Sequence, residues 1–184
     1  MAEALLRDLI ATHGLPARAI SAGLYPSGSP ATADAIKVMA DRGLDLKAHR
    51  SRQIDDAILR PADLIVTMTR EHVREVAVAD VSFLEKTFTL KELVALGDTV
   101  GPRRSTEPLE SWLVRLGADR KRSALLGVGH DPAFDVEDPI GGTTGQYRAT
   151  AAELDELLGR MVALLWPEHR ARAVQGPTAQ GRTA

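Results

Sequence analysis

The sequence predicts an α/β fold in which a parallel sheet is covered by helices on both faces. Short apolar segments typical of strands alternate along the chain with amphipathic segments typical of helices, which is the pattern of βαβ units. Residues 63–68 (DLIVTM) are almost continuously apolar, as expected of a strand that is buried on both faces of a parallel sheet.

Three segments are predicted to be strands. Residues 19–24 run into a turn segment at 26–28, residues 63–68 form the most apolar segment, and residues 87–90 precede a helical pattern. Together they supply the parallel sheet.

The helix with the clearest pattern is predicted over residues 143–166, where apolar side chains recur at steps of three and four and form one stripe facing the core. A helix after residue 29 is predicted to use Ser29 as its cap and Pro30 in its first turn. The first helix begins at Met1 without a capping side chain before it. Glycines or turn residues bound the predicted helices 1–14, 30–43, 69–78, 91–96 and 109–116.

The 184 residues, about 19.8 kDa, suit one domain with a tail. We predict a single α/β domain over residues 1–167, because the apolar pattern stops at Pro167. Residues 168–184 carry almost no apolar side chains and are predicted to form a disordered tail.

Composition limits the classes of function. Lys and Arg number 23 against 25 Asp and Glu, and this balance argues against a nucleic-acid-binding or membrane-surface protein. No apolar run is long enough to span a membrane, and no signal peptide is recognisable, so we expect a cytoplasmic protein. The chain has no cysteine, which excludes disulfides, thiolate catalysis and Cys-ligated metal within these residues. No metal site is predicted, because the five histidines lack metal-ligand spacing, and no cofactor is predicted.

The most informative polar tract is residues 135–142 (DVEDPIGG). Its three carboxylates, Asp135, Glu137 and Asp138, lie within four residues, and like-charge repulsion raises the pKa of such groups so that one can donate a proton. Asp-Pro is also a common turn former, and from the residues alone a turn is the favoured interpretation. The glycine-rich residues 141–145 admit an anion cradle or a threonine-capped helix start, of which we favour the latter.

Six segments in this order resemble the low-molecular-weight protein-tyrosine-phosphatase family, over residues 1 to about 166. The tract 88–93, together with 138–142 and the later Tyr147, is most similar to the bacterial branch that includes protein-arginine phosphatases. The segments are 1–6 (MAEALL), 21–24 (SAGL), 49–52 (HRSR), 63–69 (DLIVTMT), 88–93 (FTLKEL) and 138–142 (DPIGG).

The resemblance implies a doubly wound sheet of four parallel strands and a cytoplasmic enzyme that acts on phosphorylated proteins without a cofactor. In this family a loop of the form C-x-x-x-x-x-R-[ST]-P follows the first strand and leads directly into Met-Ala-Glu-Ala. Its cysteine thiolate attacks phosphorus, and an aspartate of an Asp-Pro loop protonates the leaving group and then activates water. That aspartate corresponds to Asp138; Asp131, which also precedes a proline, lacks the following Gly-Gly and is set aside.

This chain departs from the family where the chemistry begins. It starts at the methionine that follows the family's loop, so the central first strand, the nucleophilic cysteine and the phosphate-binding arginine are missing. We favour a start placed inside a longer phosphatase gene, a hypothesis that the codons upstream of Met1 would test. The alternatives are a catalytically inactive phosphatase-like binding protein and, more distantly, a remnant of an arsenate reductase of the same fold.

Two further expectations follow from the resemblance. The missing strand would lie between residues 19–24 and 63–68, so we expect a groove one strand wide there, with Asp138 near one mouth. Ile140 stands where many tyrosine phosphatases have an aromatic residue, which weakens the case for phosphotyrosine against phosphoarginine without deciding it.

Overall fold

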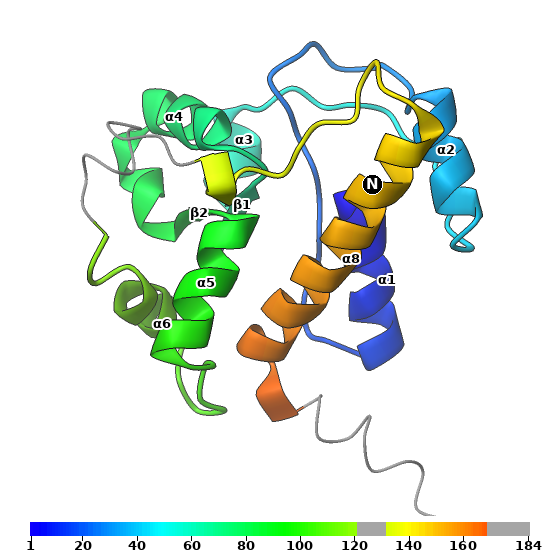
Figure 1. Cartoon of the computed structure of the whole chain (residues 1–184). Helices are drawn as coiled ribbons and strands as arrows, with labels where there is room; N and C mark the ends of the chain where they lie inside the picture. The colour runs from blue at the N-terminus through cyan, green and yellow to red at the C-terminus, as the bar shows by residue number, and fades with distance from the viewer. Residues whose placement is uncertain (121–131, 169–184) are drawn as a thin grey trace, which may run out of the picture.

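The computed structural model describes residues 1–120 and 132–168 (Figure 1). The chain is rich in helix, and its strands are short and parallel. In order, the elements are α1 (Ala2–His13), α2 (Ala33–Ala40), α3 (Asp56–Leu59), β1 (Ile65–Thr67), α4 (Arg70–Ala79), the 3-10 helix η1 (Val81–Lys86), β2 (Thr87–Thr89), α5 (Leu90–Val100), α6 (Leu109–Leu116), the 3-10 helix η2 (Pro132–Phe134) and α8 (Thr144–Leu165). The fold class predicted from the sequence is confirmed in this α/β arrangement.

The sheet consists of β1 and β2, which pair in parallel with Val66 opposite Phe88. All three residues of β2 are buried, whereas Ile65 and Val66 of β1 remain partly exposed. The prediction that residues 63–68 are buried on both faces is therefore wrong for β1. The reason is that β1 has a strand neighbour on one edge alone among the described residues.

Residues 19–24 do not form the predicted strand. Their backbone makes one parallel bridge, between Gly23 and Gln53, with Gly23 N–H donating to Arg52 O at 2.9 Å and Ile54 N–H donating to Gly23 O at 2.9 Å. In the described part of the chain the sheet thus has two strands rather than the four that the resemblance implies. A strand is defined by its ladder, and residues 19–24 have no ladder partner on the side that faces β1.

Most helices are placed as predicted, with shifted ends. α2 begins after Thr32, whose hydroxyl accepts from Ala35 N–H, and not after Ser29, because Pro30 is held in a bridge with Arg50. α5 continues to Val100, four residues beyond the end of the helix predicted over residues 91–96. The short helices α3 and η1 were not predicted, since neither is long enough to show a periodic pattern.

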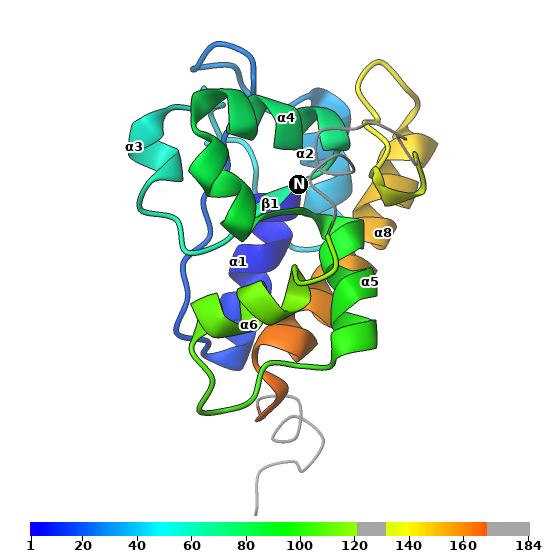
Figure 2. The same cartoon turned by 90° about the vertical axis from the view of Figure 1, so that its left-hand side faces the viewer.

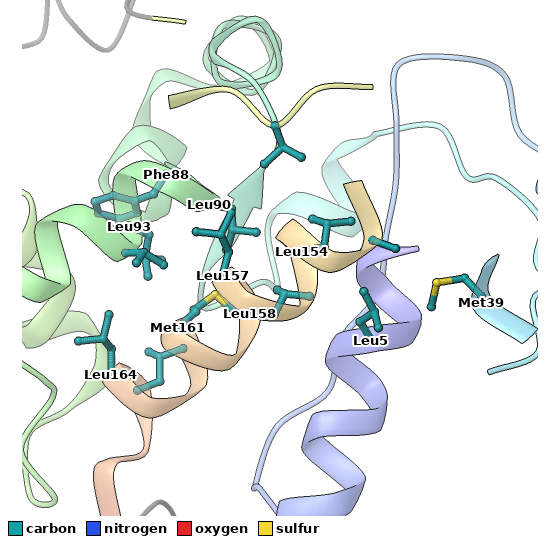
Figure 3. Close-up of a cluster of buried hydrophobic side chains, with 14 of the residues drawn as sticks. Leu5, Met39, Phe88, Leu90, Leu93, Leu154, Leu157, Leu158, Met161 and Leu164 are labelled. Atoms are coloured by element: carbon teal, nitrogen blue, oxygen red, sulfur yellow. The ribbon is translucent and has the colours of Figure 1, made fainter. Parts of the chain in front are cut away.

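The core is organised around α8. Its apolar stripe packs against α1, α2 and α5, and α5, α8 and α1 lie side by side (Figure 1, Figure 2). Leu154, Leu158 and Met161 of this stripe face Leu5 of α1 and Leu90 of α5 (Figure 3). This packing confirms the helix predicted over residues 143–166. The segment that carries Asp138 leads directly into this well-packed helix.

The proposed boundary between domain and tail remains a prediction. α8 ends at Leu165, and residues 169–184 lie outside the described residues. Within residues 1–120 and 132–168, no helix is both long and apolar enough to cross a membrane.

Candidate functional site

A large groove separates residues 19–24 from β1. It has a volume of about 1580 Å³, and one wall is formed by residues 17–24 while the other is formed by residues 62–69. Leu154, Leu158 and Met161 of α8 line its interior. No backbone hydrogen bond joins residues 19–24 to β1 in the described part of the chain. The groove predicted from the sequence is confirmed.

The N terminus of α1 lies in this groove. Met1 lines it, and burial lowers the pKa of the Met1 ammonium although the nearby Glu3 carboxylate opposes this shift. Glu3 accepts a hydrogen bond from the Ser21 hydroxyl and lies 3.6 Å from the Arg52 guanidinium and 3.9 Å from His49 Nδ1. These contacts connect the start of α1 to one wall of the groove.

The buried ammonium makes the stability of the 184-residue chain depend on pH. The unfolded amine has a pKa of about 8, and the folded state has a lower pKa, so the unfolded state binds more protons between the two values. The free energy of unfolding should therefore rise as pH increases through the window just below 8. Denaturant titrations from pH 6 to 9 would show this rise, and acetylation of the α-amino group should remove it. A rise that persists after acetylation would assign it to other groups.

Asp138 lies at the mouth of the groove, as predicted. Its side chain is exposed, and its Oδ1 accepts a hydrogen bond from the Ile140 backbone N–H at 3.0 Å. Gly142 N–H donates to Pro139 O at 2.8 Å, which closes the turn that Asp-Pro favours. Gly141 adopts a positive φ of 78°, a conformation that glycine tolerates best. One carboxylate oxygen of Asp138 is thus fixed by the turn, and the second has no such partner in the turn.

The turn is followed directly by α8. Thr143 accepts from the Gln146 N–H while the Gln146 side chain accepts from the Thr143 N–H, a reciprocal capping box. The favoured interpretation of residues 141–145, a threonine-capped helix start, is confirmed. The Asp138 turn is consequently attached to the longest and best-packed helix.

The Asp135 carboxylate of the tract has a different role from that of Asp138. Asp135 accepts a hydrogen bond from the Arg70 backbone N–H at 2.9 Å, at the first turn of α4. Val136 N–H donates to Met68 O at 2.8 Å, immediately after β1. Asp135 and Asp138 therefore bond to different backbone amides, and the tract is fastened to the carboxyl end of β1.

Sequence reasoning missed a buried charged cluster beside this tract. Arg70, Glu92 and Arg120 form it, and we call it the arginine–glutamate cluster. Burial lowers the pKa of Arg120, and the Glu92 carboxylate opposes this effect. The one sequence signal available was the Thr89-x-x-Glu92 pattern, which forms the capping box of α5. Nothing in the spacing of Arg70 and Arg120 indicated that they would meet.

Within residues 1–120 and 132–168, no three histidine, aspartate or glutamate side chains gather closely enough to hold a metal ion. Asp131, the second Asp-Pro aspartate, lies outside the described residues.

Comparison with known proteins identifies the family. The sequence profile described as "Low molecular weight phosphotyrosine protein phosphatase" matches residues 1–99, more than half of the chain. The chain belongs to this family. Among curated relatives of the family, the protein-arginine-phosphatase of Bacillus subtilis is 28% identical over 171 residues, covering 92% of this chain and 90% of the relative. The probable low molecular weight protein-tyrosine-phosphatase EpsP of Ralstonia solanacearum is 38% identical over 94 residues, covering 50% of this chain and 62% of the relative.

Solved structures of the family share the fold. A low molecular weight protein tyrosine phosphatase from Bacillus subtilis, solved in solution, superposes with a TM-score of 0.64 at 28% identity, covering 92% of this chain and 89% of that one. The corresponding enzyme from T. tengcongensis also gives 0.64, at 26% identity, covering 89% of this chain and 88% of that one. The resemblance to the bacterial branch of low molecular weight phosphatases is confirmed.

Proposed function

We propose that this chain provides the general acid and the scaffold of a protein phosphatase. In this proposal a further β-strand, which we call the delivered strand, occupies the groove, and the loop between it and α1 carries the nucleophile. The observation that supports this most is the exposed position of Asp138 on the lining of the groove between residues 19–24 and β1. Asp138 lies on a segment fastened to the carboxyl end of β1, the end of a parallel sheet at which ligands bind in doubly wound folds.

The geometry favours a parallel strand in the groove. Strands in a sheet lie about 4.8 Å apart, so a strand paired with the open edge of β1 would lie inside the groove, on the side of β1 that faces residues 19–24. Such a strand would end near Met1, where α1 begins. A loop between this strand and α1 would then hold an anion at the positive end of the α1 dipole.

The proposed chemistry is phosphoryl transfer in two steps. A thiolate carried by the delivered loop attacks phosphorus, the bond from phosphorus to the leaving atom breaks, and Asp138 gives its proton to that leaving group. Ionised Asp138 then takes a proton from water, which attacks phosphorus and releases phosphate and the thiolate. These 184 residues contain no cysteine, so the nucleophile belongs to the delivered segment.

The substrate class is a phosphorylated protein, as the family name implies, and the choice lies between phosphoarginine and phosphotyrosine. Ile140 is 68% exposed at the edge of the Asp138 turn and offers no aromatic ring for stacking on a tyrosine side chain. The relative from Bacillus subtilis that matches most of the chain is named a protein-arginine-phosphatase. Both observations favour phosphoarginine.

Activity of the chain alone tests the assignment of the nucleophile. The 184-residue chain should hydrolyse aryl phosphates no faster than buffer, because the nucleophile and the anion-binding loop are absent from it. The comparison is with the extended chain, which we define as residues 1–184 preceded by an apolar strand and Cys-x-x-x-x-x-Arg-Ser-Pro. The extended chain should show turnover that vanadate inhibits. Vanadate-sensitive hydrolysis by the 184-residue chain would overturn the assignment.

A phosphoprotein-binding role is the second candidate. One observation favours it, which is that these 184 residues contain no cysteine. It predicts that the 184-residue chain binds phosphopeptides measurably and that adding the strand and loop does not produce turnover. Isothermal titration with a phosphoarginine peptide and its unphosphorylated counterpart separates the two functions.

A further inference from the structure

Arg70 connects the buried charged cluster to the segment that carries Asp138. We propose that Arg70 is a positioning residue for residues 134–138 and that the arginine–glutamate cluster holds Asp138 at the mouth of the groove. None of the three cluster residues lines the groove itself. The inference rests on the proposed role of Asp138 and goes beyond it in assigning what orients that side chain.

Glu92 has a complete partner without Arg70. Arg120 donates from Nε to Glu92 Oε1 at 3.2 Å and from Nη2 to Oε2 at 3.1 Å, a pairing through two hydrogen bonds. Arg120 Nη2 also donates to Thr87 O at 2.8 Å, and its guanidinium stacks 3.9 Å from the Phe88 ring centre. This arginine therefore neutralises Glu92 and joins it to β2.

Arg70 adds a second positive charge to the same carboxylate. Its Nη2 donates to Glu92 Oε1 at 2.9 Å, while its residue exposure is only 7%. Its Nη1 is buried and has no hydrogen-bond partner among the described residues. Arg120 already pairs with both oxygens of Glu92, so Glu92 does not need a second guanidinium, and burying one is costly. Stabilisation of Glu92 is thus a poor explanation for the buried Arg70 side chain.

The contacts of Arg70 with residues 134 and 135 explain its position better. Its guanidinium lies 5.6 Å from the ring centre of Phe134, within the range of a cation–π interaction. Its backbone N–H donates to the Asp135 carboxylate at 2.9 Å. Side chain and backbone of one residue therefore hold two consecutive residues of the segment that leads to Asp138.

The next residues extend this attachment toward the proposed acid. Val136 N–H donates to Met68 O at 2.8 Å, two residues before Arg70, and the Thr150 hydroxyl donates to Glu137 O at 3.4 Å. Asp138 is the first residue after these attachments. Loss of the Arg70 side chain releases Phe134, and the whole segment should then open more often.

Hydrogen exchange of the 184-residue chain tests the attachment. Arg70→Met removes the charge and keeps the length of the side chain, and Arg60→Met is a matched control, because exposed Arg60 lies 5.7 Å from the Phe83 ring centre. Peptides covering residues 134–140 should exchange about tenfold faster in Arg70→Met, as expected for loss of a partly buried cation–π contact, while peptides of α8 stay unchanged. Arg60→Met should leave residues 134–140 at the wild-type rate.

Three results would overturn the proposal. The first is that the Val136 amide of the wild-type chain is not protected from exchange. The second is that residues 134–140 exchange at the same rate in Arg70→Met and in the wild type. The third is that exchange in Arg70→Met is faster by the same factor in every part of the chain. Each would mean that Arg70 does not specifically hold the segment.

Leaving-group dependence in the extended chain tests the link to Asp138. Arg70→Met should lower the rate of enzyme phosphorylation in the first turnover about tenfold for phenyl phosphate, whose leaving group needs a proton, and leave that rate nearly unchanged for 2,4-dinitrophenyl phosphate. Equal losses on both substrates would reduce Arg70 to a structural residue. If the extended chain itself is inactive, the proposed function fails, whereas the exchange result still decides whether Arg70 holds the segment.

Discussion

Asp138→Asn in the extended chain should lower the rate of enzyme phosphorylation by about 10²–10⁴-fold, the usual contribution of a general acid. Asparagine keeps the size of the side chain and its carbonyl oxygen can still accept the Ile140 N–H, so the turn should remain folded. It has no proton to give to a leaving group. Stopped-flow measurement of the first turnover with phenyl phosphate isolates this step.

Asp131→Asn is the control, because Asp131 also precedes a proline but lacks the Gly-Gly that follows residues 138–140. Its rate should match that of the unmutated extended chain. Equal rates in the two variants, or a loss confined to Asp131→Asn, would show that Asp138 is not the acid.

The second large effect concerns folding of the 184-residue chain. Its groove leaves the edge of β1 that faces residues 19–24 without a strand partner, and each backbone polar group there that is shielded from water costs about 1–3 kcal/mol. A few such groups rival the total stability of a domain, about 5–15 kcal/mol. We expect this chain to be less stable than the extended chain and to aggregate through the open edge at high protein concentration.

The extended chain is the matched comparison for folding. It should be monomeric and unfold in one transition, because its additional strand pairs with β1 and fills the space against α8. Size-exclusion chromatography and urea denaturation of both chains measure this. A 184-residue chain that is as resistant to urea and as monomeric as the extended chain would contradict the expected instability.

Local patterns predicted the helices that pack through one continuous stripe. α8 extends over Thr144–Leu165, and its stripe of Leu154, Leu158 and Met161 lies in the core because a 3.6-residue period has a single buried face. α2 was misplaced at its start because Pro30 is constrained by Arg50, which is distant in the sequence. A cap is a local signal, and this bridge is not.

Strand prediction failed where it depended on a neighbour. Residues 19–24 have an apolar composition suited to a strand, yet their backbone bonds to residues 52–54 and faces the groove. β1 is partly exposed for the same reason. Composition indicates that a segment can be a strand, whereas pairing decides whether it is one.

The candidate site was predicted in part. Asp138 came from its Asp-Pro-x-Gly-Gly context and the family resemblance, and its position at the groove mouth agrees with that expectation. Arg70 was not found, since an arginine in the first turn of a helix is ordinary, and its contacts with Glu92 and Phe134 join three separate elements. Clusters of this kind depend on tertiary structure, and the sequence spacing of their residues does not predict that they will be in contact.

The central claim is that a delivered strand fills the groove and thereby completes a phosphatase. Hydrogen exchange of the 184-residue and extended chains, combined with turnover of a phosphoarginine peptide by the same samples, tests it most directly. We predict that the extension protects the amides of residues 65–67 and 19–24 and that the protected sample alone hydrolyses the peptide in a vanadate-sensitive way. Turnover without that protection, or protection without turnover, would contradict the account.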